Sequence, residues 1–129
     1  TLPPRVPFPA SEAEAQNRLR AFTEGQDAPV YHYAKERDRL DLDATSRLSP
    51  YLRFGLLSAR QVLVAAYGAL AAALDGDAIQ GVQTWLNELI WREFYVHIIY
   101  HFPRVRGSSF RPEYDQIAWE NDTGSFASW

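Results

Sequence analysis

Cysteine is absent from the sequence, and only one of its 13 basic residues is a lysine, Lys35. Without cysteine the chain has neither disulfides nor metal sites built on thiolates, and its composition favours a cytoplasmic location. Apolar runs long enough to span a bilayer are also missing, so no membrane partner is expected. Because hydrophobic residues make up 47% of the chain, extended disorder is excluded as well.

The formal net charge of −3 argues against a general polyanion-binding protein. The remaining basic residues are all arginines, whose planar guanidinium bonds phosphate and carboxylate groups through two hydrogen bonds at once. A genome that favours arginine codons would give the same bias. Composition therefore allows a specific anion site without requiring one.

Local signals predict an all-α fold, a helical bundle with no strand pattern. Residues 1–10 contain four prolines and are expected to form a linker or arm, which hints at further protein before it. Residues 11–129 form the predicted domain. Ser11 and Glu14 form a capping box that begins a helix ending near Gly25.

Further helices are predicted along the rest of the domain. A short one covers residues 31–38, and another begins with Ser49 as N-cap before Pro50 and ends at Gly55. Ser58 caps a helix closed by Asp75-Gly76, and a long helix runs from about Ile79 to His101, before Pro103. Residues 104–121 are expected to be mostly loop with a turn of helix near Ile117, and residues 122–129 to begin another helix.

The stretch WLNELIWREFY, residues 85–95, places Glu88 and Arg92 among large apolar side chains on one side of the long helix. A buried charge is costly unless it is paired and hydrogen-bonded. Two interpretations meet this demand. Glu88 and Arg92 form an ion pair one helical turn apart, or both face a cavity with aromatic walls, where Arg92 meets a phosphate.

Hydroxyl groups gather in the stretch ATSRLSPYL, at Thr45, Ser46 and Ser49, beside a predicted helix start. Small hydroxyls and backbone N–H groups at a helix N-terminus suit a phosphate, although an N-cap by Ser49, which is the commoner feature, explains the same pattern. Two other signals are weaker. His97 and His101 have a spacing that can hold a metal, but no third ligand is evident, so no metal site is predicted. The loop RVRGSSFR could contact phosphates or be a solvated basic loop.

Together, TSRLSPYLRFGLLSARQV and WLNELIWREFYVHIIYHFP resemble the helical FAD-binding domain of the DNA photolyase and cryptochrome family. The resemblance extends from Ser11 to the last residue, and ELIWREFY is more similar to the cyclobutane-dimer photolyases than to other branches. It implies FAD as cofactor and UV-damaged DNA as partner. The implied FAD-binding residues are Tyr33, Thr45, Ser46, Arg47, Leu48, Ser49, Trp85 and Arg92.

The resemblance also implies a DNA-binding wall. Its residues are Arg37, Glu88, Leu89, Ile90, Trp91, Arg92, Glu93, Phe94 and Tyr95, of which Glu88 and Trp91 contact the damaged pyrimidines and are the expected catalytic residues. In the family, reduced flavin absorbs light and passes an electron to a pyrimidine dimer, which splits and returns the electron. The dimer leaves the base stack to reach the flavin.

Two parts of the family pattern are not recognised, the N-terminal antenna domain and the C-terminal helices that complete the flavin pocket. The chain is therefore expected to be a fragment, inactive alone, that binds FAD weakly or not at all. Because Trp85, Trp91 and Tyr95 are expected to be exposed, it should self-associate or depend on a missing partner. Two alternatives stay open. One is a cryptochrome-like blue-light photoreceptor, and the other is a helical interaction module without a ligand.

Overall fold

The computed structural model describes residues 8–129, so most of the predicted arm of residues 1–10 lies outside the described part. It divides into two compact units, Thr1–Trp91 and Arg92–Trp129. All regular elements of the described residues are helical, which confirms the all-α prediction. Their bounds are α1 Glu12–Thr23, α2 Pro29–Glu36, α3 Ser49–Arg53, α4 Ala59–Ala72, α5 Gly76–His101, the 3₁₀ helices η1 Pro103–Arg106 and η2 Pro112–Gln116, and α6 Thr123–Ser128.

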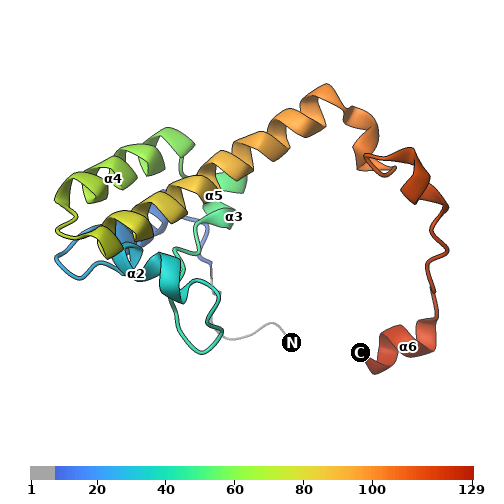
Figure 1. Ribbon diagram of the computed structural model, residues 1–129, viewed down its shortest axis with the longest axis horizontal. Helices are drawn as coiled ribbons and strands as arrows, with labels where there is room; N and C mark the ends of the chain where they lie inside the picture. The colour runs from blue at the N-terminus through green and yellow to red at the C-terminus, as the bar shows by residue number, and fades with distance from the viewer. Residues whose placement is uncertain (1–7) are drawn as a thin grey trace. The chain divides into compact units, whose positions relative to one another are not determined.

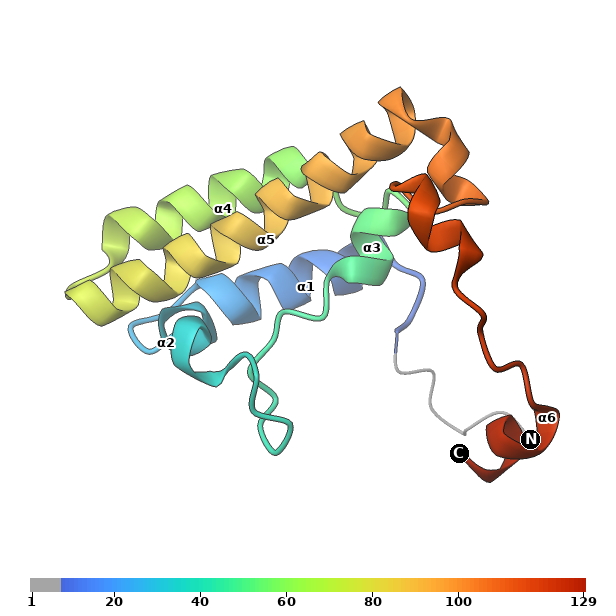
Figure 2. The same ribbon diagram turned by 45° about the vertical axis from the view of Figure 1, so that its right-hand side comes forward.

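The core of the first unit lies between α1, α2, α4 and the first half of α5. In this unit α1 packs against α4 and α2, and α4 runs beside α5 (Figures 1 and 2). Each helix contributes small or aliphatic side chains at helical spacing, and α1 and α5 add one large aromatic each, Phe22 and Trp85. The buried face of α5 ends at Leu89, the last buried residue of that helix.

Several helix ends follow the predicted caps. Ser11 accepts a hydrogen bond from the Glu14 backbone N–H, and Gly25 has a positive φ of 111° just after α1. Ser58 and Gln61 form a reciprocal capping box at α4, where the Ser58 hydroxyl accepts from the Gln61 backbone N–H and Gln61 Oε1 accepts from the Ser58 N–H.

Several predicted boundaries were wrong. The short helix expected at residues 31–38 spans Pro29–Glu36, so it begins and ends two residues earlier. Ser49 is the first residue of α3 and not its N-cap, because Leu48 occupies the cap position and no side chain caps this helix. The helix that Ser58 caps ends at Ala72, before Asp75-Gly76. Those two residues begin α5 instead, since Asp75 accepts a hydrogen bond from the Ala78 N–H, and α5 therefore starts earlier than Ile79.

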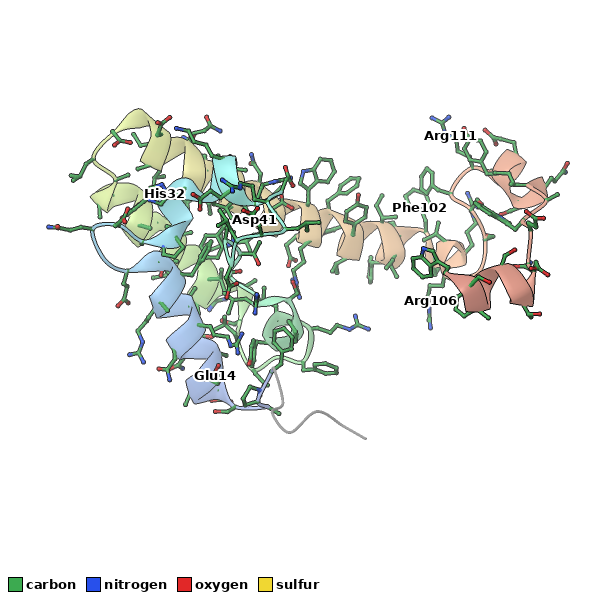
Figure 3. All side chains as sticks on the ribbon, turned by 90° about the horizontal axis from the view of Figure 1, so that it is seen from below. Glu14, His32, Asp41, Phe102, Arg106 and Arg111 are labelled. Atoms are coloured by element: carbon green, nitrogen blue, oxygen red, sulfur yellow. The ribbon has the colours of Figure 1, made fainter. Side chains whose placement is uncertain are left out.

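The second unit contains the end of α5 and the segments after it. The stretch RVRGSSFR is held together by its own first residue. The Arg104 guanidinium donates to the Ser109 carbonyl at 2.8 Å and to the Phe110 carbonyl at 2.5 Å. Figure 3 labels Arg106 and Arg111 in this part of the chain. The helical turn predicted near Ile117 is η2, which ends one residue earlier, and α6 begins after Asp122, whose carboxylate accepts from the Ser125 N–H.

Candidate functional site

Glu88 is held by an arginine from a different helix. The Arg37 guanidinium follows the end of α2 and donates from Nη1 to Glu88 Oε1 on α5, across 51 residues of sequence. The two side chains are 33% and 41% exposed. In the second unit, Arg92 pairs with Glu93. The ion pair that holds Glu88 thus joins two helices, which the spacing along one helix does not predict.

Tyr33 lies one helical turn before Arg37, and its ring contacts the Arg37 guanidinium group. Its ring contacts Phe22 edge-on, with centroids 5.9 Å apart, and the Arg37 guanidinium carbon lies 5.8 Å from its centroid. Burial raises the pKa of the Tyr33 phenol, and the nearby Glu88 carboxylate raises this pKa further, while Arg37 lowers it. The Tyr33 phenol therefore stays neutral to a higher pH than an exposed tyrosine does.

Trp85 packs in the core against Phe22, the residue that also contacts Tyr33. Its ring lies 5.0 Å from that of Phe22, and the side chain is only 3% exposed. The expectation that Trp85 would be exposed in this chain was wrong, because α1 supplies Phe22 as a packing partner. Tyr33, Phe22 and Trp85 form one continuous set of rings, called here the aromatic wall.

The hydroxyl-rich segment lines a cavity of about 190 Å³ to which Phe22 also contributes. Thr45, Ser46 and Arg47 contribute to its lining, together with Arg18, Ala21, Phe22, Pro29 and Asp43. Arg47 is paired with Asp43 at 2.8 Å, and Arg18 with Glu14 at 2.7 Å. The lining therefore combines hydroxyl groups with two guanidinium groups, each paired with a carboxylate, and one of these carboxylates, Asp43, belongs to the lining itself. Hydroxyl and guanidinium groups are donors that suit a phosphate.

Arg47 has a backbone conformation that non-glycine residues rarely adopt, with φ at 50°. Such strain costs on the order of 1–3 kcal/mol and persists only where the surroundings enforce it. Leu48, which follows, is buried at 2% exposure and fixes the segment to the core. Ser49 is exposed and does not line the cavity, so only part of the predicted phosphate segment faces it.

The predicted DNA-binding wall is divided by burial. Leu89 is buried and packs in the core, whereas Ile90 and Trp91, the last residues of the first unit, are exposed. Phe94 and Tyr95 of the second unit are also exposed, and their rings contact each other edge-on at 5.5 Å. Of the residues predicted for this wall, the structure brings Arg37 and Glu88 into contact. Tyr33, from the predicted FAD-binding set, lies beside Arg37.

Two residues of the site were not expected from the sequence, Phe22 and Arg18. Both lie on α1 at positions that an amphipathic pattern assigns to the core or its edge, so the sequence held no signal for a ligand-facing role. Phe22 is the residue that connects the cavity to the aromatic wall.

Other features of the described residues add no second site of this kind. A cavity of about 760 Å³ beside the ends of α1 and α4 has two exposed side-chain contacts on its lining, a hydrogen bond between His32 and Asp27 and an ion pair between Lys35 and Asp77 (Figure 3 labels His32). His97 and His101 stack at 6.2 Å, and residues 8–129 contain no group of three side chains that could hold a metal. Nor does this part of the chain include a helix that could cross a membrane.

Comparison with known proteins gives a consistent result. A family model described as the FAD binding domain of DNA photolyase matches residues 85–129. The chain is 40% identical over 124 residues to a deoxyribodipyrimidine photo-lyase of Thermus thermophilus, covering 96% of this chain and 27% of that protein. The enzyme of the same name from Escherichia coli is 37% identical over 123 residues, covering 95% and 25%.

A solved structure agrees with these sequence matches. A bacterial class III photolyase from Agrobacterium tumefaciens superposes with a TM-score of 0.80 at 30% identity, covering 92% of this chain and 23% of that one. The chain therefore spans about a quarter of the length of these relatives.

Proposed function

We propose that this chain is a segment of a deoxyribodipyrimidine photo-lyase. It belongs to the DNA photolyase family and corresponds to part of that family's helical FAD-binding domain. Such an enzyme repairs UV-induced cyclobutane pyrimidine dimers in DNA by light-driven electron transfer from reduced FAD. In this proposal residues 11–129 are part of the FAD-binding domain, and the longer protein is cytoplasmic.

The residues around the cavity fit one end of the cofactor. Thr45 and Ser46 contribute hydroxyl groups to the lining of the cavity, and Arg47 and Arg18 contribute guanidinium groups that would exchange their carboxylate partners for phosphate oxygens. At about 190 Å³ the cavity is smaller than the roughly 300–1,000 Å³ usual for small-molecule sites, so it holds only part of a dinucleotide. When bound, FAD supplies the photochemistry, and the protein supplies position and electrostatic field.

On the lesion side, Glu88 and Trp91 have complementary tasks. Trp91 is 52% exposed and offers an aromatic face to bases that have left the helix stack. Glu88 accepts hydrogen bonds from the pyrimidine edges, and Arg37 lies beside it to meet the DNA backbone. The position of Glu88 in the first unit, next to the aromatic wall, is the observation that carries the repair function.

The test uses the full-length protein that contains this chain. Absorbance bands of flavin after gel filtration, together with light-dependent loss of dimers from an irradiated oligonucleotide, are the expected result. Flavin bands without repair would favour a cryptochrome-like photoreceptor. A colourless protein would leave a helical interaction module, and repair function would then be refuted.

A further inference from the structure

We propose that the Arg37–Glu88 ion pair is a latch that DNA opens, so that Arg37 exchanges the Glu88 carboxylate for a backbone phosphate and Glu88 becomes available to the damaged bases. This inference rests on the proposed function. It concerns the state of the same site before and after DNA binds, and it makes Arg37 a positioning residue for Glu88 in the free protein.

The surroundings of Arg37 hold it in place but leave it accessible. Its Nη1 donates to Glu88, its Nε lies 3.7 Å from the Asp38 carboxylate, and its guanidinium carbon lies near the Tyr33 ring. The Arg37 and Glu88 side chains are both partly exposed, and Asp38 is 91% exposed. An ion pair shielded this little is weak enough to exchange partners.

A phosphate is a strong competitor for this guanidinium, because it offers bidentate hydrogen bonds and full negative charge. Once Arg37 turns to the DNA backbone, Glu88 is left as a carboxylate beside a polyanion. That arrangement is unfavourable unless Glu88 gains new hydrogen-bond donors.

Only damaged DNA supplies those donors. The N–H groups on the edges of two flipped pyrimidines can donate to the Glu88 carboxylate, whereas bases that stay paired and stacked in undamaged duplex cannot. Opening the latch is therefore compensated on dimer-containing DNA and uncompensated elsewhere. The pair thus raises discrimination by weakening the binding of undamaged DNA.

The experiment measures binding of undamaged and dimer-containing duplex by the FAD-loaded full-length protein, at several salt concentrations. Glu88→Gln removes the charge that holds Arg37, and its matched control is Asp38→Asn, which removes one charge next to Arg37 without breaking the Nη1 hydrogen bond. We expect Glu88→Gln to tighten undamaged binding about two- to fivefold, the worth of a partly exposed pair. Asp38→Asn should change it less, and the ratio of dimer to undamaged affinity should fall only in Glu88→Gln.

Arg37→Gln gives a second test, and its salt dependence can be measured without the Glu88 variant. If Arg37 meets a phosphate in the complex, this variant makes the negative slope of log K against log salt shallower by about 0.9. In the Arg37→Gln background, Glu88→Gln should no longer tighten undamaged binding.

An unchanged salt slope in Arg37→Gln, or equal effects of Glu88→Gln and Asp38→Asn, would overturn the latch while wild-type repair still supported the proposed function. Wild-type protein that neither prefers dimer-containing DNA nor repairs it would overturn both.

Discussion

The raised pKa of Tyr33 makes the stability of the fold depend on pH in the alkaline range. Its pKa is raised above the ordinary value of 10.0, so the folded state holds the phenolic proton more tightly than the unfolded state does. This contribution is fully present below pH 10.0 and is lost as the pH rises through the raised pKa. We expect the free energy of unfolding to fall above about pH 10.

Tyr33→Phe removes this titration and should make that alkaline decline less steep. Urea unfolding at about pH 9, 10 and 11 measures it. Equal declines in wild type and Tyr33→Phe would show that the Tyr33 environment does not distinguish the two protonation states.

Trp91 is the exposed aromatic residue that follows the buried part of α5, and we expect it to stack on flipped bases. In the full-length protein, Trp91→Ala should weaken binding of dimer-containing DNA by roughly 1–3 kcal/mol, the usual worth of base–aromatic stacking. Undamaged duplex should be affected less, because phosphate contacts dominate there. Trp119→Ala, which removes an equally large exposed ring outside the site, is the control. Equal losses on both DNAs would assign Trp91 to packing.

At the scale of elements, α5 approaches α2 so closely that only glycine fits between them. A Cβ atom at Gly81 would lie 2.4 Å from the Tyr31 carbonyl oxygen and 2.5 Å from that of Val30. Since both neighbours are backbone atoms, α2 would have to move away, and Arg37 follows directly after this helix. The geometry of the Arg37–Glu88 pair therefore depends on this glycine.

We expect Gly81→Ala to destabilise the chain by about 1–3 kcal/mol despite the better helix propensity of alanine. Gly68→Ala in the middle of α4 is the matched control, because a Cβ there meets nothing within 4 Å. That variant should stabilise the helix by up to about 1 kcal/mol. Thermal unfolding of both variants measures the difference, and similar shifts would refute the close approach.

The segment between α2 and α3 makes a separate prediction about cofactor retention. Thr45 and Ser46 line the cavity, whereas Ser49 does not. In the full-length protein, Thr45→Ala with Ser46→Ala should lower the fraction of flavin retained after gel filtration, because two phosphate donors are lost. Ser49→Ala should lower it less. If Ser49→Ala had the larger effect, the phosphates would lie at the start of α3 and not in the cavity.

At the scale of the whole molecule, we expect the exposed apolar residues of α5 to cause self-association. Ile90, Trp91, Phe94 and Tyr95 are all exposed, although Trp85 is not. Apolar surface of this kind favours association. We expect the 129-residue chain to self-associate or to require a partner, to retain no FAD and to show no repair activity. Sedimentation and binding of a hydrophobic dye measure the first, and a monomer that binds no dye would contradict it. A monomer that holds FAD tightly would show that these residues alone suffice for the pocket.

The sequence by itself determined where most of the helices lie and where several of them begin or end. Caps act within three or four residues, so the Ser58 cap and the glycine after α1 could be recognised without a structure. Where two local signals competed, as at Asp75 between α4 and α5, sequence reasoning chose the wrong helix because the same residue can end one helix or cap the next. The family motifs likewise identified the candidate residues one by one.

Only the tertiary structure decided how those residues combine. Glu88 meets Arg37 across 51 residues, Trp85 is buried because Phe22 packs on it, and Gly81 sets the distance between α2 and α5. Each of these depends on the packing of helices that are distant in sequence, and side-chain spacing within one helix carries no information about it. For the same reason the sequence offered Glu88 a partner on its own helix, while the fold supplied one from another.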